Sequence, residues 1–267
     1  MKIHFVKVLS LCFFSLFFTK TFSQNVDSTT PGTYSSTVPL DAVSATVEIW
    51  GAGGSGGGSK KTGRGGGGGG GGAYATQTFT VTAGETITYE IGAGGAIATN
   101  SGSGNTGGES TLNHTISETS ITVGGGEGGT QSNSFDNAGG AGGTATGGAT
   151  NIPGSPGGSN GFGIGGQGGD SGNTINTGGN GGILTHGSPG HIPGGGGGGA
   201  YHSGLGLGNS SFRDGGAGAN GKVIITYEII LRPVINNFSP SAVCVGETVT
   251  LTGRNFTNAT SVKFNGT

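Results

Sequence analysis

Apolar and polar residues alternate along several short stretches of the chain. Between residues 41 and 50, every second position is apolar, namely Val43, Ala45, Val47 and Ile49. This period of two predicts a β-strand with one buried face. The same pattern predicts strands over 74–81, with Phe79 inward and Tyr74 outward, and over 86–91. Further strands are expected over 109–112, 120–123 and 222–228. No segment has a helical period, so the predicted fold class is all-β.

Glycine fills most of the sequence between these strands. The chain of 267 residues contains 67 glycines, and 63 of them lie between Gly51 and Gly221. The pentapeptide Gly-Gly-x-Gly-Gly occurs five times, at 53–57, 125–129, 139–143, 165–169 and 178–182. This period of three matches an extended helix with three residues per turn and no internal hydrogen bonds. Two interpretations are open: a flexible linker, or an ordered bundle whose glycine helices bond to one another sideways. We expect the bundle, because linkers rarely place paired glycines between well-formed strands.

Three sequence features carry a family resemblance. They are the strand ending at Trp50 followed by GAGGSGGG, the run VTAGETITYEIGAGG over 81–95 with GGEST at 107–111, and the closing GGAGANGKVIITY over 215–227. Over about residues 30–230 the chain resembles the glycine-rich domain of bacterial surface proteins and phage tail adhesins. It is also similar to the glycine-rich domain of anaplastic-lymphoma-kinase-type receptors. The resemblance implies a small β-sandwich that carries a bundle of polyglycine II helices, with ligand-binding loops at the bundle ends.

A second resemblance begins at Pro233. The motifs Phe238-Ser239-Pro240, GETVTLTG over 246–253 and VKFNG over 262–266 are similar to the start of an IPT/TIG domain, an immunoglobulin-like sandwich. The 35 residues after Arg232 are too few for the seven or so strands of such a sandwich. We therefore expect a signal segment over 1–23, a glycine-rich domain over 24–230 and a truncated IPT/TIG domain over 231–267. The truncation leaves the partner of Cys244 unidentified.

The N-terminus has the pattern of a secretory signal peptide. Lys2 and Lys7 precede an apolar run from Val8 to Phe18, and small residues lie before a cleavage point after Ser23. That run is too short for the ~20 residues that span a bilayer. We therefore expect a secreted, cell-surface-associated bacterial protein that does not span the membrane.

Charge excludes one large class of partner. Residues 24–267 carry eight cationic and thirteen acidic side chains, a formal charge of −5, and no Lys or Arg lies between Arg64 and Arg213. Nucleic-acid binding requires cations that displace phosphate counterions, so we expect none. Lys60, Lys61 and Arg64 form one basic cluster, which is either a solvated loop or a contact for an anionic glycan.

Several motifs suggest chemistry without the context that it needs. Residues 51–56 match GxGxxG, but the glycine run that follows cannot open the helix of a dinucleotide site. His186, His191 and His202 lack the spacing and cysteines of a typical zinc site, and Glu109 and Glu118 are expected at strand ends. The sequence therefore predicts no enzyme, no metal and no cofactor.

The candidate binding surface is formed by the stretches 186–193 and 201–213, where large side chains occur among the glycines. The candidates are His186, His191, Tyr201, His202 and Phe212, with Tyr201 alternatively a cap on the end of the bundle. We expect an adhesion or recognition module for a surface glycan or protein receptor. The alternatives are a purely structural spacer or matrix protein, and an ice-binding protein. The oligomeric state is left open.

Overall fold

The computed structural model describes residues 20–60, 63–98, 102–132, 137–202, 212–244 and 246–256. These residues form fourteen strands, and no helix occurs among them, as the sequence pattern predicted. Ser23–Glu228 forms one compact unit, and the described residues from Ile229 onward belong to another. The described part of the chain contains no helix that is long and apolar enough to cross a membrane. Residues 1–19 of the predicted signal segment lie outside the described residues.

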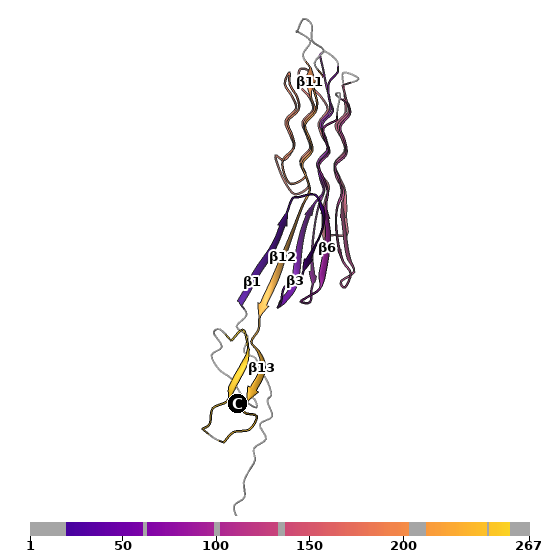
Figure 1. Ribbon diagram of the computed structural model, residues 1–267. Helices are drawn as coiled ribbons and strands as arrows, with labels where there is room; N and C mark the ends of the chain where they lie inside the picture. The colour runs from indigo at the N-terminus through magenta and orange to yellow at the C-terminus, as the bar shows by residue number, and fades with distance from the viewer. Residues whose placement is uncertain are drawn as a thin grey trace, which may run out of the picture. The chain divides into compact units, whose positions relative to one another are not determined.

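Two five-stranded sheets form the sandwich of the larger unit (Figure 1). One has the strand order β1 (Lys20–Ser28), β12 (Lys222–Leu231), β3 (Ala42–Trp50), β5 (Tyr74–Thr80) and β10 (Thr150–Ile152). The other has the order β2 (Gly32–Thr37), β6 (Thr86–Ile91), β7 (Ser110–His114), β8 (Thr119–Val123) and β9 (Ala145–Thr146). β1 extends across the expected cleavage point after Ser23, so cleavage there would leave Gln24 to Ser28 of this strand.

The core of the sandwich consists of the alternate apolar residues of these strands. The fully buried members include Val47 and Ile49 of β3, Ile87 of β6, Leu112 of β7 and Ile225 of β12. The predicted strands over 41–50, 74–81, 86–91 and 222–228 are confirmed, with Phe79 inward as expected. The side chains of the two inner faces supply the main apolar surface, about 25 cal/mol for each Å² removed from water.

One side chain on the outer face of these strands is buried rather than exposed. Tyr74 was predicted to point outward with the threonines of β5, but only 4% of it is exposed. Its ring packs on Trp50 with centroids 4.8 Å apart, and its hydroxyl donates to Glu48 Oε1 at 3.0 Å. The alternation of faces is kept, and Tyr74 is buried because the glycine segment that contains Gly172 lies against it and Trp50 at the end of the sheet. Burial and the neighbouring Glu48 raise the pKa of the Tyr74 hydroxyl.

Beyond the strand ends, extended glycine-rich segments run side by side (Figure 1), and we call them the glycine bundle. The members are 51–59, 65–73, 93–95, 102–108, 124–132, 138–143, 154–158, 165–172, 178–182, 187–191, 194–200 and 213–220. In segment 65–73 every third N–H donates to the same neighbour, at N···O distances of 2.8–3.0 Å. The pairs are Gly66 to Ala200, Gly69 to Gly197 and Gly72 to Gly194; Gly67 to Thr130, Gly70 to Glu127 and Ala73 to Gly124; Gly68 to Gly158 and Gly71 to Ser155.

This three-residue cycle is the pattern expected of polyglycine II helices. The carbonyl groups of segment 65–73 accept from three further segments, 54–57, 140–143 and 166–172, so six neighbours surround it. Segments 51–59 and 194–200 are bonded on all sides in the same way, and these three central segments are buried along their length. The glycine segments are therefore ordered, and the flexible-linker interpretation is wrong for them.

This packing explains the exposure of the spacer residue x in each Gly-Gly-x-Gly-Gly unit. In the outer segments one residue in three faces solvent, and the spacers Glu127, Ala141, Gln167 and Asn180 are exposed. Ser55 is the exception, because its segment is central and the side chain is fully buried. Its hydroxyl accepts the backbone N–H of Asn105 at 2.7 Å, which pairs the only polar atom of the side chain.

Close approach of the backbones explains why glycine is needed at the inward positions. A Cβ atom added to Gly70 would collide with the carbonyl oxygen of Ala141, and one added to Gly56 would collide with that of Gly198. Both obstacles are backbone atoms that are themselves hydrogen-bonded in the bundle, so they cannot move aside cheaply.

The second unit contains a two-stranded sheet in its described part. β13 (Val234–Ser239) pairs antiparallel with β14 (Thr250–Arg254), with an irregularity between Ile235 and Asn237. Cys244 is exposed and forms no disulfide within the described residues. Residues 257–267, which carry the last motif of the IPT/TIG resemblance, lie outside the described residues.

The bundle predicts that alanine destabilises the protein at an inward position and has little effect at an exposed one. Gly70→Ala should lower the free energy of unfolding by about 2–3 kcal/mol, because its Cβ has no space. Glu127→Ala should change it by less than about 0.5 kcal/mol, because this spacer is exposed and Ala141 occupies the same position of another unit. Denaturant unfolding of the full chain followed by circular dichroism measures both. Equal effects would contradict the inward role of glycine.

Candidate functional site at the end of the glycine bundle

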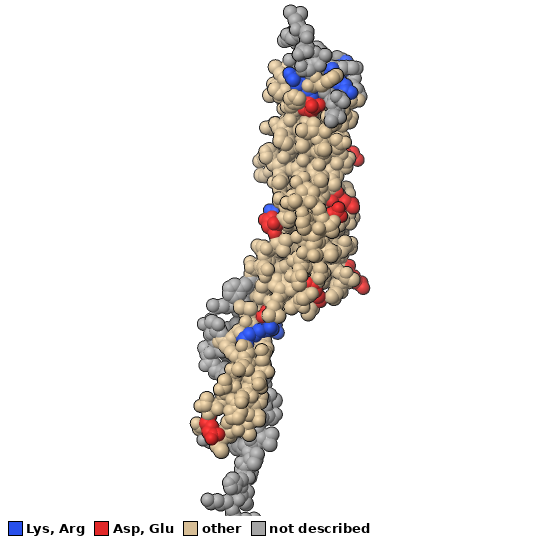
Figure 2. Space-filling model, in the orientation of Figure 1, with Lys and Arg blue, Asp and Glu red and all other residues tan. Residues whose placement is uncertain are grey.

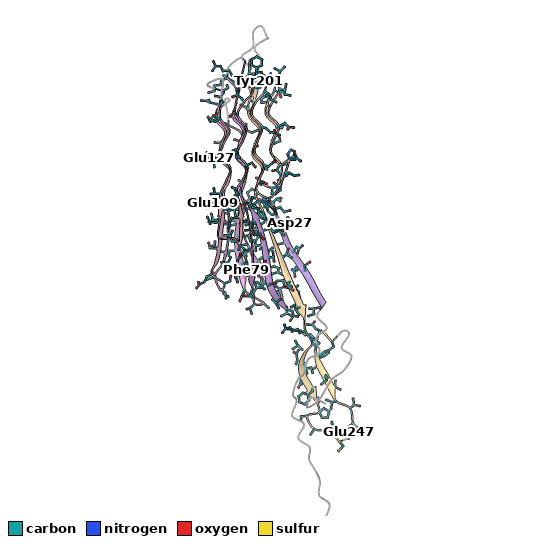
Figure 3. All side chains as sticks on the ribbon, turned by 180° about the vertical axis from the view of Figure 1, so that it is seen from behind. Asp27, Phe79, Glu109, Glu127, Tyr201 and Glu247 are labelled. Atoms are coloured by element: carbon teal, nitrogen blue, oxygen red, sulfur yellow. The ribbon has the colours of Figure 1, made fainter. Side chains whose placement is uncertain are left out.

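The end of the bundle farthest from the sandwich is called the tip here. Its described residues include 59–60, 63–65, 158–165, 182–187, 201–202 and 212–213. β4 (Arg64–Gly65) pairs with β11 (Tyr201–His202), and Ser59 pairs with Arg213 through two backbone hydrogen bonds of 2.7 and 3.1 Å. Tyr201 lies at this end in Figure 3. Turns far apart in the sequence thus form one surface.

Four of the five predicted binding residues lie at the tip, and one does not. His186 Nδ1 accepts the backbone N–H of Asp214 at 2.9 Å, which joins the 182–187 turn to the chain that carries Phe212. His191 lies toward the sandwich instead, where its backbone N–H donates to Thr177 at 2.7 Å. The separation follows from the bundle geometry, because the segment 187–191 runs away from the tip.

The tip residues differ in their accessibility. Phe212 is 52% exposed, so its ring is available to a partner. Tyr201 is only 7% exposed, which fits the alternative that it caps the bundle. The Nδ1 atom of His202 is buried and has no hydrogen-bond partner in the described part of the chain. The intervening residues 203–211 of this predicted surface lie outside the described residues.

A second group of exposed apolar side chains, not predicted from the sequence, lies at the tip. Phe162, Ile164, Ile183 and Leu184 are all exposed, and Phe162 is entirely so at 106%. Phe162 and Gly163 form a tight turn closed by the bridge between Gly161 and Ile164, and Gly163 has the positive φ of +85° that such a turn requires. The available signal was that isolated large apolar residues interrupt glycine runs at the turns.

Between the 158–165 turn and the neighbouring segment 178–182 lies a hollow of about 510 Å³, which we call the tip hollow. Glycines 158, 161, 165 and 181 form part of its wall. The side chains that line it are Ser159, Ile164, Gln167, Asn180 and Ile183. Gln167 and Asn180 are spacers of two Gly-Gly-x-Gly-Gly units, so the bundle period directs their amides outward at the same place.

Positive charge also gathers at the tip, together with some negative charge (Figure 2). Asp214 follows Arg213 there. Of the predicted basic cluster, Lys60 is exposed and Arg64 partly so, while Lys61 lies outside the described residues. The structure adds Arg213, which the bridge to Ser59 places beside this cluster. Lys222, the other cation of the 28–228 stretch, pairs with Asp27 at 3.0 Å near the sandwich. The long part between carries acidic groups such as Glu127 and Asp170.

The other titratable groups of the described residues lie apart from the tip. Among the described residues, no three His, Cys, Asp or Glu side chains gather closely enough to hold a metal ion. Glu109 and Glu118 are both exposed, one just before β7 and the other in the turn after it.

A buried histidine in the sandwich is held by hydrogen bonds and by a stacked aromatic ring. His114 is 1% exposed, with Nδ1 2.7 Å from Ser117 Oγ and Nε2 3.1 Å from Glu85 Oε2. Its ring stacks on Phe79 with centroids 5.0 Å apart. The backbone N–H of Thr82 donates to Glu85 at 2.9 Å, and this bond, with a smaller contribution from His114, lowers the pKa of Glu85 below its ordinary 4.5.

The lowered pKa of Glu85 predicts acid sensitivity of the sandwich. A carboxyl whose pKa is lower when folded stabilises the fold above its unfolded pKa, and this contribution is lost as the pH falls through the folded value. The free energy of unfolding should therefore decrease from about pH 5 downward, and Glu85→Gln should reduce that decrease. Unfolding titrations of the full chain from neutral to acid pH measure the slope. Glu90→Gln, at an exposed position of β6, is the control. An unchanged slope in Glu85→Gln would contradict this assignment.

Comparison with known families identifies the larger unit. A family model described as a glycine-rich domain matches residues 28–228. No curated protein sequence matches the chain.

Proposed function

The chain belongs to the glycine-rich domain family, and we propose that it is a secreted or cell-surface recognition module that contacts its partner through the tip. The observation that carries this proposal is the group of exposed apolar side chains at the tip, although others such as Ile116 and Ile175 are exposed elsewhere. The bundle buries glycine and small residues, whereas the turns at its end expose Phe162, Ile183 and Phe212. Apolar side chains that are exposed together mark interaction sites more often than chance placement.

The cations at the tip support the same role. Lys60, Arg64 and Arg213 lie at the end of a unit that is otherwise acidic, so an approaching partner with negative groups is attracted to that end. Surface glycans and protein receptors both present such groups. The proposed activity is binding, and no catalytic step is part of it.

The location and the second unit complete the proposal. The signal-peptide pattern over 1–23 supports export, and the IPT/TIG-like motifs after Pro233 support display on a bacterial surface next to a further immunoglobulin-like domain. A polyglycine II bundle then serves as a rigid stalk between the surface and the tip.

A structural spacer is the competing function. This structural function is favoured by the exposed x positions of the Gly-Gly-x-Gly-Gly units. They carry unrelated side chains such as Glu127, Ala141 and Asn180, which form no common binding surface along the bundle. In that case the tip side chains would have no effect on attachment.

A double substitution separates the two functions. His186→Ala with Phe212→Ala removes two exposed tip side chains and should weaken binding to a cell-surface or glycan array by about tenfold or more. The matched control is His191→Ala with Ile116→Ala, which removes the same kinds of exposed side chain outside the tip. Array binding by the full chain is the measurement. Unchanged binding in the tip variant, or no binding by the unmodified chain, would support the spacer instead.

A further inference from the structure

We propose that the tip hollow is a binding site for a neutral sugar ring of an extracellular polysaccharide. This inference rests on the proposed recognition function and names the chemical class that the hollow takes. Its volume of about 510 Å³ lies within the range of about 300–1,000 Å³ that is usual for small-ligand sites.

Two side-chain amides supply the polar part of the site. Gln167 and Asn180 both line the hollow, and neither side chain has a hydrogen-bond partner within the described residues. Each amide offers two N–H donors and one carbonyl acceptor, and Ser159 adds a hydroxyl. Neighbouring hydroxyl groups on a sugar ring both donate and accept, so amides match them without a net charge.

A sugar ring also needs an apolar surface for its C–H groups, and the same hollow provides one. Ile164 and Ile183 line the hollow, and the fully exposed Phe162 lies in the turn between the lining residues Gly161 and Ile164. The exposed aromatic ring is available to stack on the C–H face of a sugar, at the cost of ordering its side chain.

The walls of the hollow are fixed before any ligand arrives. The N–H of Gly158 donates to the carbonyl of Gln167 at 2.7 Å, and that of Gly165 donates to the carbonyl of Gly182 at 3.0 Å. The backbone around Gln167 is therefore held by the bundle, and binding orders few groups. Preorganisation of this kind improves affinity because the cost of ordering has already been met in folding.

The absence of ionisable side chains from the lining selects a neutral ligand. None of the residues that line the hollow is Asp, Glu, Lys, Arg or His. A carboxylate or sulfate that entered would lose hydration without gaining a partner charge. Acidic polymers are expected at the cations Lys60, Arg64 and Arg213 instead, which makes charge a way to tell the two surfaces apart.

The test measures binding of the full chain to soluble neutral polysaccharides, with mannan, β-glucan and galactan as probes, and to the acidic alginate. The variant is Gln167→Ala with Asn180→Ala. Ala141 shows that alanine fits this position of the repeat. The control is Glu127→Ala, a spacer whose segment bonds to 66–73 and 138–143 and which does not line the hollow. Loss of two neutral hydrogen-bonding groups should weaken neutral-glycan binding by about tenfold.

The outcomes separate this inference from the function on which it rests. The inference is supported if a neutral probe binds, if the amide variant and Phe162→Ala both weaken it, and if Glu127→Ala does not. It is overturned if the amide variant retains full affinity, or if only alginate binds. If the His186 and Phe212 variant abolishes cell-surface binding in either of those cases, the recognition function stands and the hollow is not its site.

Discussion

The hydrogen bond between backbones of neighbouring extended segments is the interaction on which this structure depends. Each such bond contributes only about 1 kcal/mol net, while ordering a residue costs about 1–2 kcal/mol. One glycine segment with a single neighbour would therefore not stay ordered. A central segment such as 65–73 has six bonded neighbours, and both its N–H and its C=O groups are used. Order comes from this closed arrangement and from its attachment to a conventional apolar core.

That attachment is visible where the strands pass into the bundle. The indole N–H of Trp50 donates to the carbonyl of Gly172 at 3.1 Å, and the Ser110 hydroxyl donates to the carbonyl of Trp50 at 2.8 Å. Ser110 Oγ also accepts the N–H of Gly92 at 3.0 Å. The last residues of β3 and the first of β7 thus hold three glycine segments in register. The sandwich fixes the starting positions, and the three-residue cycle propagates them toward the tip.

Sequence alone predicted much of the framework, because alternation in β3, β6 and β12 and the paired glycines are local signals. It did not reveal β2, whose polar residues Thr33, Ser35 and Ser36 lack alternation and which pairs at an edge with β6. Nor did it distinguish Ser55 from the other spacers, since burial depends on whether a segment is central in the bundle. The tip hollow was missed for a related reason: Ile164 and Asn180 meet through lateral packing, which no sequence spacing encodes. Likewise, His191 is near His186 in sequence, but the segment 187–191 carries it away from the tip, toward the sandwich.

Excluding large side chains from the bundle has an electrostatic consequence as well as a steric one. The glycine segments separate the basic tip from the sandwich, where Lys222 is paired with Asp27. Exposed charges farther apart than a Debye length of about 8–10 Å are largely screened from each other. The tip cations therefore act on a partner without cancellation by the acidic groups of the sandwich. Because the sides of the bundle carry Glu127 and Asp170 but no Lys or Arg between Arg64 and Arg213, a negatively charged surface is repelled from the flank and attracted at the end. The lack of a glycine side chain, which permits the close packing, thus also favours an end-on approach of a negatively charged partner.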